Sequence, residues 1–104
     1  MANYWQRGES LDYMNSGSTK IEAGAVITYG ARIGVAGCDI EPGEMGSIHV
    51  EGVFEMPKGS GAITAGAEVY WTGTAIATSG DTKAGYAAQA AAADDTVVLV
   101  KINA

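Results

Sequence analysis

The sequence is poor in the residues that most often carry catalysis and metal binding. Cysteine and histidine occur once each, as Cys38 and His49. One cysteine excludes an internal disulfide and a cysteine-rich metal site, and we interpret Cys38 as a small buried or loop thiol rather than a nucleophile. A triad or a metal site needs a histidine held by partners, and no second ligand type stands near His49 at a recognisable spacing. We therefore expect no metal site and interpret His49 as a solvated strand histidine.

Basic residues are also sparse. Six Lys and Arg stand against twelve Asp and Glu, which gives a formal net charge of −6. The bases are scattered singly along the chain, at Arg7, Lys20, Arg32, Lys58, Lys83 and Lys101. Non-specific affinity for nucleic acids comes mainly from clustered Lys and Arg that neutralise phosphates. We therefore expect no nucleic-acid partner.

Long apolar runs and nucleotide-binding motifs are missing. No run approaches the roughly 18 apolar residues of a membrane helix, and residues 1–7 lack the basic and then apolar pattern of a signal peptide. We expect no membrane partner and synthesis in a cytoplasm. The richest glycine stretch, residues 58–62, lacks the Lys of a phosphate-binding loop, and no Gly-x-Gly-x-x-Gly occurs. These absences predict no cofactor and no enzymatic activity.

Glycine and apolar residues are what the sequence has in abundance. Fifteen glycines in 104 residues are about twice the usual share, and 47% of the residues are hydrophobic. Glycine marks turns and bulges, so many short elements joined by tight turns follow. We predict one small all-β domain, a barrel or a sandwich with short strands and Gly-rich turns.

The clearest alternation of apolar and polar residues lies in residues 48–56 and predicts one strand, ended by Pro57. A second strand is predicted over residues 96–102, which are apolar on both faces as in a central strand. Residues 84–93 favour a strand around Tyr86 that runs into a loop, with a short helix as the alternative. The side chains expected to be buried are Ile48, Val50, Phe54, Met56, Val98, Val100 and Ile102.

An internal repeat links two parts of the chain. The pattern Ile-x-Ala-Gly-Ala occurs in residues 21–25 and again 42 residues later in residues 63–67, and each copy leads into an apolar β-former and an aromatic residue. A weaker third copy covers residues 40–46. Each copy predicts a turn with a left-handed glycine that launches a strand. The carboxylates Asp39, Glu41 and Glu44 around this copy do not have the spacing of a calcium loop, and turn chemistry explains Asp39 and Pro42-Gly43.

The remaining feature is aromatic and lies near the N-terminus. Tyr4 and Trp5 precede any periodic segment, and Tyr13 follows in a polar stretch. Large apolar groups in a terminal arm either fold back on the core or contact a partner. We expect an N-terminal arm in residues 1–20, extended and contact-forming, followed by a β domain in residues 21–104. The candidate contact residues are Tyr4, Trp5, Arg7 and Tyr13.

Several strings together resemble a known family. They are Gly8-Glu9-Ser10-Leu11-Asp12-Tyr13, Ile40-x-x-Gly43-Glu44-x-Gly46, Glu51-Gly52-Val53-Phe54-Glu55-Met56-Pro57-Lys58, Ala65-Gly66-Ala67-x-Val69-Tyr70-Trp71 and Gly85-Tyr86-Ala87. The resemblance is to the domain-of-unknown-function 2190 family, the phage capsid cement or decoration proteins, and it covers nearly the whole chain. Such proteins are sometimes described as RecA/RadA-type recombinases. This chain has neither the phosphate loop nor the basic surface that strand exchange requires.

The resemblance implies a structural virion protein. It would bind the major capsid protein on the outer surface of a tailed-phage head, stabilise the shell, and associate with itself, with a trimer favoured. It would be made in the cytoplasm of the bacterial host. The alternative from another class is a ligand-binding or carbohydrate-binding β module on the virion surface.

Overall fold

The computed structural model describes residue 2 and residues 8–104. Across these residues the chain forms strands joined by turns, and no helix occurs among them. The strands are β1 (Ser10–Met14), β2 (Val26–Tyr29), β3 (Arg32–Ala36), β4 (Met45–His49), β5 (Val53–Pro57), β6 (Glu68–Trp71), β7 (Ile76–Ala77), β8 (Thr82–Ala87) and β9 (Val97–Ile102). The all-β prediction is confirmed, and the segment around Tyr86 is the predicted strand.

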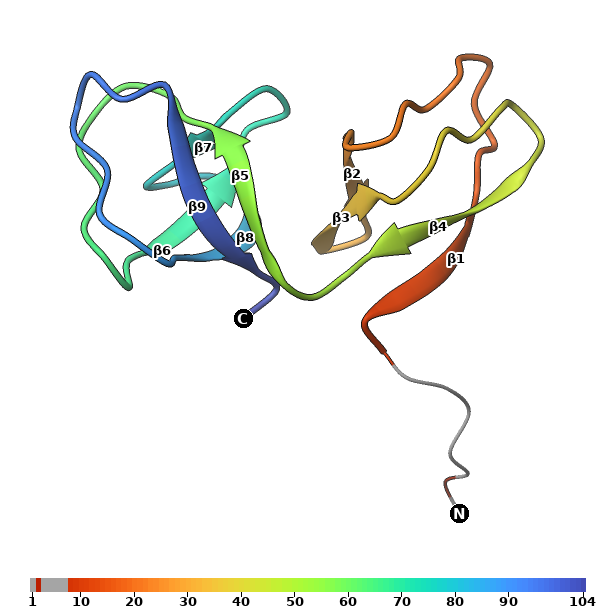
Figure 1. Ribbon diagram of the computed structural model, residues 1–104, viewed down its shortest axis with the longest axis horizontal. Coiled ribbons are helices and arrows are strands. Elements are labelled where there is room, and N and C mark those ends of the chain that lie inside the picture. The colour runs from red at the N-terminus through yellow and green to blue at the C-terminus, as the bar shows by residue number, and fades with distance from the viewer. Residues whose placement is uncertain (1, 3–7) are drawn as a thin grey trace.

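The strands form two antiparallel sheets that lie side by side (Figure 1). The first has the order β1-β4-β3-β2 and the second the order β5-β9-β8-β6-β7. The second sheet curls until β7 meets the end of β5 at a single bridge, Lys58 to Ile76. One bridge does not close a ladder, so the architecture is two packed sheets of a sandwich type and not a closed barrel.

The two sheets are copies of one four-stranded unit. In strand order, β1, β4, β3 and β2 correspond to β5, β9, β8 and β6, and β7 is an addition to the second unit. The repeat seen in the sequence starts both copies: Gly24 donates to Ala36 O and Gly66 donates to Ala87 O, each at 2.8 Å. Both glycines have a positive φ, 87° and 81°, which explains why glycine stands there. The predicted turn that launches a strand is therefore confirmed in both copies.

The equivalence extends to the only buried polar side chains among the described residues, Asn15 and Lys58. Each follows the first strand of its unit. The Asn15 amide donates to the carbonyls of Thr19 and Ile40, both at 2.9 Å. The Lys58 ammonium donates to the carbonyls of Gly59 and Ala93, at 2.9 and 3.2 Å. In each unit one buried polar side chain is therefore satisfied by backbone carbonyls.

The single strand predicted over residues 48–56 is wrong. The chain bends at residues 50–52, so β4 ends in the first sheet and β5 begins in the second. Apolar alternation continues across the bend because both strands bury one face, although they bury it against different neighbours. Ile48 and Met56 are buried as predicted, whereas Val50 and Phe54 are only half-buried.

The predicted central strand β9 lies between β5 and β8. Val98, Val100 and Ile102 are buried as expected. The opposite face of β9 is more open than its sequence suggests, since Val97 is 43% exposed and Leu99 is half-buried.

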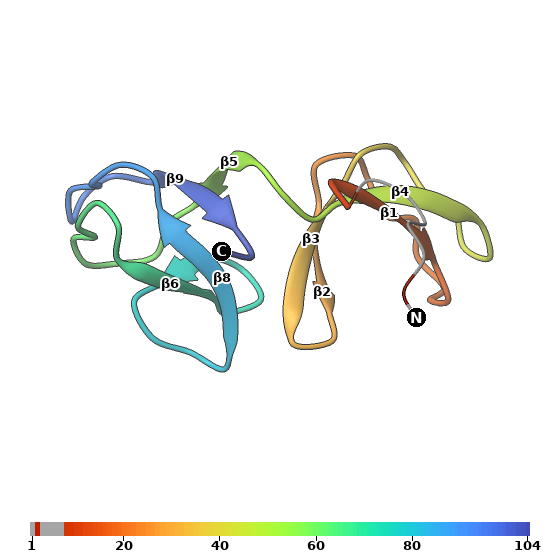
Figure 2. The ribbon, with the colours of Figure 1, turned by 90° about the horizontal axis from the view of Figure 1, so that it is seen from below.

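Two apolar cores result, and β3 joins them. The larger core lies in the second unit and includes Ile33 and Val35 of β3, while the smaller core lies in the first unit and includes Ala36 of the same strand. Side chains alternate along a strand, so one strand can serve two cores. Figure 2 shows the β2 and β3 hairpin next to the second unit, and β3 contacts β8.

The structure also changes the expected N-terminal arm. Ser10–Met14 form β1, which pairs with β4 over its full length, so this part of the segment is an element of the sheet. The sequence analysis did not predict this strand, because β1 buries only one face and polar residues surround it. Residue 1 and residues 3–7 lie outside the described residues.

Candidate functional site

Of the four contact residues predicted from the sequence, Tyr4, Trp5 and Arg7 lie outside the described residues. Tyr13 lies on β1, is half-buried and packs against the smaller core. Its ring centroid is 6.1 Å from that of Tyr29, with the planes at 60°. Such a tilted aromatic pair is a favourable packing geometry. Part of the Tyr13 side chain therefore stabilises the first unit, and part of it stays exposed to solvent.

Two of the exposed large apolar side chains form a pair that the sequence did not reveal. Met45 is 60% and Met14 is 45% exposed, and the two residues lie directly opposite each other on β4 and β1. In the second unit Val97 is 43% exposed and lies opposite Pro57, which is also exposed. Cross-strand neighbours share one face of a sheet. Each unit therefore presents a small apolar pair to solvent, and the second unit also exposes Val53.

The strand register explains why these pairs were missed. Within β1 the side chains of Leu11 and Tyr13 pack on the core, so Met14 must project from the other face. The exposure of Met14 can be inferred only once β1 is known to be a strand. In β9 the continuous apolar run concealed which face was buried.

A groove of about 440 Å³ runs between the two units. It is lined by Val26 and Val35 from the first sheet and by Phe54 and Met56 from the second, with His49 at its side. His49 is half-buried: its Nδ1 lies 3.3 Å from Ser10 Oγ and its ring lies 5.8 Å from the Phe54 ring. It is thus less solvated than predicted. A hydroxyl and an aromatic ring are its described partners, which is packing and hydrogen bonding rather than a triad geometry.

The other candidate residues are explained by turns and surface contacts. Cys38 is an exposed free thiol. Asp39 accepts a hydrogen bond from the Ala23 amide at 2.9 Å and pairs with Lys20 at 3.3 Å. The amide and then the ammonium lower the pKa of Asp39 below its ordinary value. In the described part of the chain, no three His, Cys, Asp or Glu side chains are grouped as a metal ion requires.

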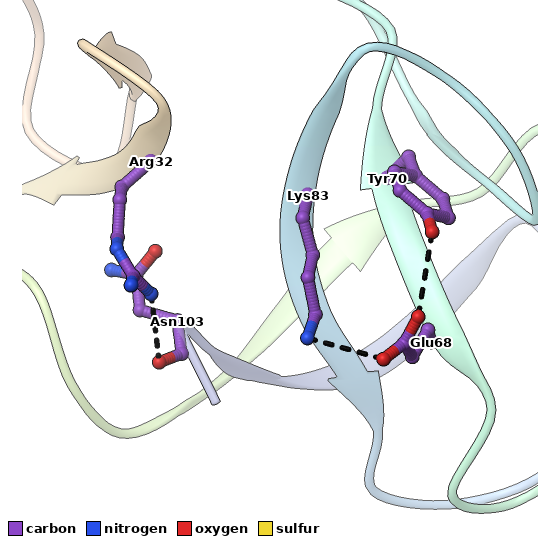
Figure 3. A network of polar contacts seen from close by, with 5 residues as sticks. All are labelled: Arg32, Glu68, Tyr70, Lys83 and Asn103. Carbon is purple, nitrogen blue, oxygen red and sulfur yellow. Dashed lines mark hydrogen bonds and ion pairs between the residues drawn. The ribbon is translucent and has the colours of Figure 1, made fainter.

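Figure 3 shows three further polar contacts. On the second unit Glu68 accepts from Lys83 at 3.2 Å and from Tyr70 at 3.4 Å, linking β6 to β8 at the surface. Between the units Arg32 approaches the carbonyl of Asn103 at 3.5 Å. Exposed pairs of this kind contribute little to stability. They describe ordinary surface chemistry and not a catalytic centre.

No helix long and apolar enough to cross a membrane occurs in residue 2 and residues 8–104.

These features define a small protein of two repeated β-sheet units that carries exposed apolar pairs on its strands. The sequence profile of the phage cement proteins matches residues 5–102, so the chain belongs to the phage cement protein family. The resemblance noted in the sequence is confirmed, and the protein is a structural component of a phage capsid. No curated protein and no solved structure gives a significant match.

Proposed function

We propose that the protein is a capsid decoration protein that binds the outer surface of a tailed-phage head and stabilises the shell. The family match over residues 5–102 carries this proposal, because it spans nearly the whole chain and the family is structural. Packed DNA presses outward on a capsid, and a small protein bound where subunits meet adds contact area without any chemistry.

The shape and charge of the molecule suit this role. It measures 39 × 38 × 21 Å along its principal axes. Its broad dimensions are sufficient for a contact of the roughly 800 Å² per partner that specific complexes bury. Its net charge of −6 suits a surface that faces solvent, away from the packaged DNA.

The proposed partner is the major capsid protein, and the proposed contact residues are Tyr4, Trp5, Arg7 and the open part of Tyr13. Aromatic and Arg side chains anchor interfaces because they bury a large area and keep a polar group for hydrogen bonding. We also propose self-association on the shell, with a trimer favoured, after synthesis in the bacterial cytoplasm.

The test compares capsids that lack the protein with capsids to which it is added back. We expect the purified protein to sediment with the capsids and to raise the temperature at which they release DNA. Bovine serum albumin at the same concentration controls for non-specific protection. If the protein stays in the supernatant and binds a bacterial polysaccharide instead, the role is that of a carbohydrate-binding module.

A further inference from the structure

The two units carry a similar arrangement of side chains on their outer strand pair. In the first unit Asp12 and Met14 of β1 lie opposite Ser47 and Met45 of β4. All four side chains are exposed. The face thus combines one carboxylate with an apolar pair two residues further along the strand.

The second unit has a similar face on β5 and β9, which also holds the exposed Val53, opposite Lys101. Glu55 and Pro57 lie opposite Leu99 and Val97. Glu55, Pro57 and Val97 are exposed and Leu99 is half-buried. Glu55 corresponds to Asp12, and the pair of Pro57 with Val97 corresponds to the pair of Met14 with Met45.

The chemistry that the two faces share indicates what they bind. No ion pair joins Asp12 or Glu55 to another residue in the described part of the chain. An exposed apolar pair beside an unpaired carboxylate is complementary to an apolar side chain flanked by Lys or Arg. A chain with net charge −6 also favours a basic partner surface.

We propose that the protein binds two copies of one partner segment, an apolar side chain beside a base, with one copy on each unit. This inference rests on the proposed function: the two copies would belong to neighbouring subunits of the shell, which the protein then bridges. In Figure 2 the pair of β1 and β4 and the pair of β5 and β9 lie on the same side of the molecule. A shell of repeated subunits offers the same segment many times, and a duplicated unit is suited to bind two of them.

Two linked contacts have a measurable consequence. Once one unit is bound, the other meets its site at a high effective concentration, so the combined affinity exceeds that of either contact by about 10²–10⁴. Loss of either contact should therefore remove most of the affinity.

The experiment uses matched single substitutions, Met45→Lys in the first unit and Val97→Lys in the second, on the full chain. Binding to capsids that lack the protein is measured by sedimentation. Each variant should bind about 10²–10⁴-fold more weakly than the parent, because lysine removes the apolar contact and repels the base of the partner. Thr78→Lys, at an exposed loop position of the second unit, adds the same charge elsewhere and should bind like the parent.

The outcomes separate the two proposals. If the parent binds capsids and only one of the two variants is weakened, or neither, then two-point binding is wrong while the decoration role stands. If the parent itself does not bind, the decoration role fails. Met45→Ser and Val97→Ser remove the apolar side chain without adding a charge. They repeat the comparison if a lysine variant has a lower melting temperature than the parent.

The carboxylates provide an independent readout. Asp12→Asn and Glu55→Asn should each weaken binding and also reduce its dependence on salt, since each removes one charge contact with the partner. Unchanged salt dependence in both variants would overturn the basic character assigned to the partner segment.

Discussion

The side-chain amide of Asn103 is hydrogen-bonded to both backbone groups of Ile33. Its Nδ2 donates to the Ile33 carbonyl at 2.8 Å, and its Oδ1 accepts from the Ile33 amide at 3.3 Å. The same Nδ2 donates to the carbonyl of Val50 at 2.9 Å. Asn103, just after β9, therefore takes the place of a neighbouring strand along the part of β3 that β4 does not cover. It also holds the segment that joins the units.

Replacing Asn103 by Ala should lower the free energy of unfolding by about 1–3 kcal/mol, because partly buried backbone groups of Ile33 lose their partners. Urea unfolding followed by circular dichroism measures the change. Asn103 has a φ of 58°, which Asp tolerates better than Ala. Asn103→Asp keeps a side chain that tolerates this φ but loses the two hydrogen bonds donated by Nδ2, so its destabilisation should come from those hydrogen bonds alone. Gln89→Ala, at an exposed position, is the control, and equal stability of all three variants would contradict the role of Asn103.

A second prediction concerns Gly85 on β8. A Cβ at this position would overlap the Lys101 carbonyl oxygen on β9, and the φ of 145° is one that other residues rarely adopt. Gly85→Ala should therefore cost about 3 kcal/mol or more, since backbone cannot move aside as a flexible side chain can. Thermal unfolding is the measurement. Gly8→Ala is the matched control because nothing lies within 4 Å of its added Cβ. If Gly85→Ala and Gly8→Ala have the same melting temperature, β8 and β9 can move apart without cost and the prediction is wrong.

The pH dependence of stability should depend on Asp39. Folding lowers the pKa of its carboxyl through the Ala23 amide and Lys20, so the ionised form is favoured in the folded state. Such a group stabilises the fold above its unfolded-state pKa, and the contribution disappears as the pH falls through the lower, folded-state pKa. The pKa of Lys20 is raised by the same contact, so its contribution is lost only as the pH rises above 10.5.

Asp39→Asn should therefore be less stable than the parent near neutral pH, and the difference should shrink as the pH falls below about 4. Urea unfolding of both proteins at several pH values checks this. Asp81→Asn, at another exposed acid, controls for the change in net charge. If the difference in unfolding free energy between Asp39→Asn and the parent stays constant from neutral to acid pH, the ionised Asp39 carboxylate is not its cause.

The sequence was informative wherever a feature depends on neighbouring residues. The turn glycines Gly24 and Gly66 and the pattern around them predicted the two turns that launch β2 and β6, since a tight turn is specified locally. The break at residues 50–52 could not be predicted in this way. Val50 and Phe54 continue the same alternation, and nothing local shows that β4 pairs with β1 while β5 pairs with β9.

Contacts between distant residues were likewise out of reach. Asn103 stands 70 residues from Ile33, and an asparagine near a chain end has many possible roles. The exposed pair of Met14 and Met45 depends on the register of two strands of which one was hidden in a polar segment. Functional surfaces built from cross-strand neighbours become visible only when the pairing is known.

The final prediction concerns the segment that precedes β1. Deleting residues 2–7 removes Tyr4, Trp5 and Arg7, the proposed capsid contacts, and leaves β1 and its pairing with β4 intact. The described core is formed by residues 11 and beyond, so the melting temperature of the free protein should stay within a few degrees of the parent. Occupancy on capsids at a limiting protein concentration should fall, because large aromatic anchors contribute much of the affinity of an interface.

The two measurements together decide the role of these residues. A fall in occupancy without a change in melting temperature identifies Tyr4, Trp5 and Arg7 as anchors. A large fall in melting temperature shows instead that the aromatic side chains belong to the fold, and the contact proposal is then wrong. The double variant Tyr4→Ser with Trp5→Ser keeps the chain length and should reproduce the loss of occupancy. If it binds as the parent does, the backbone of the segment and not its aromatic groups makes the contact.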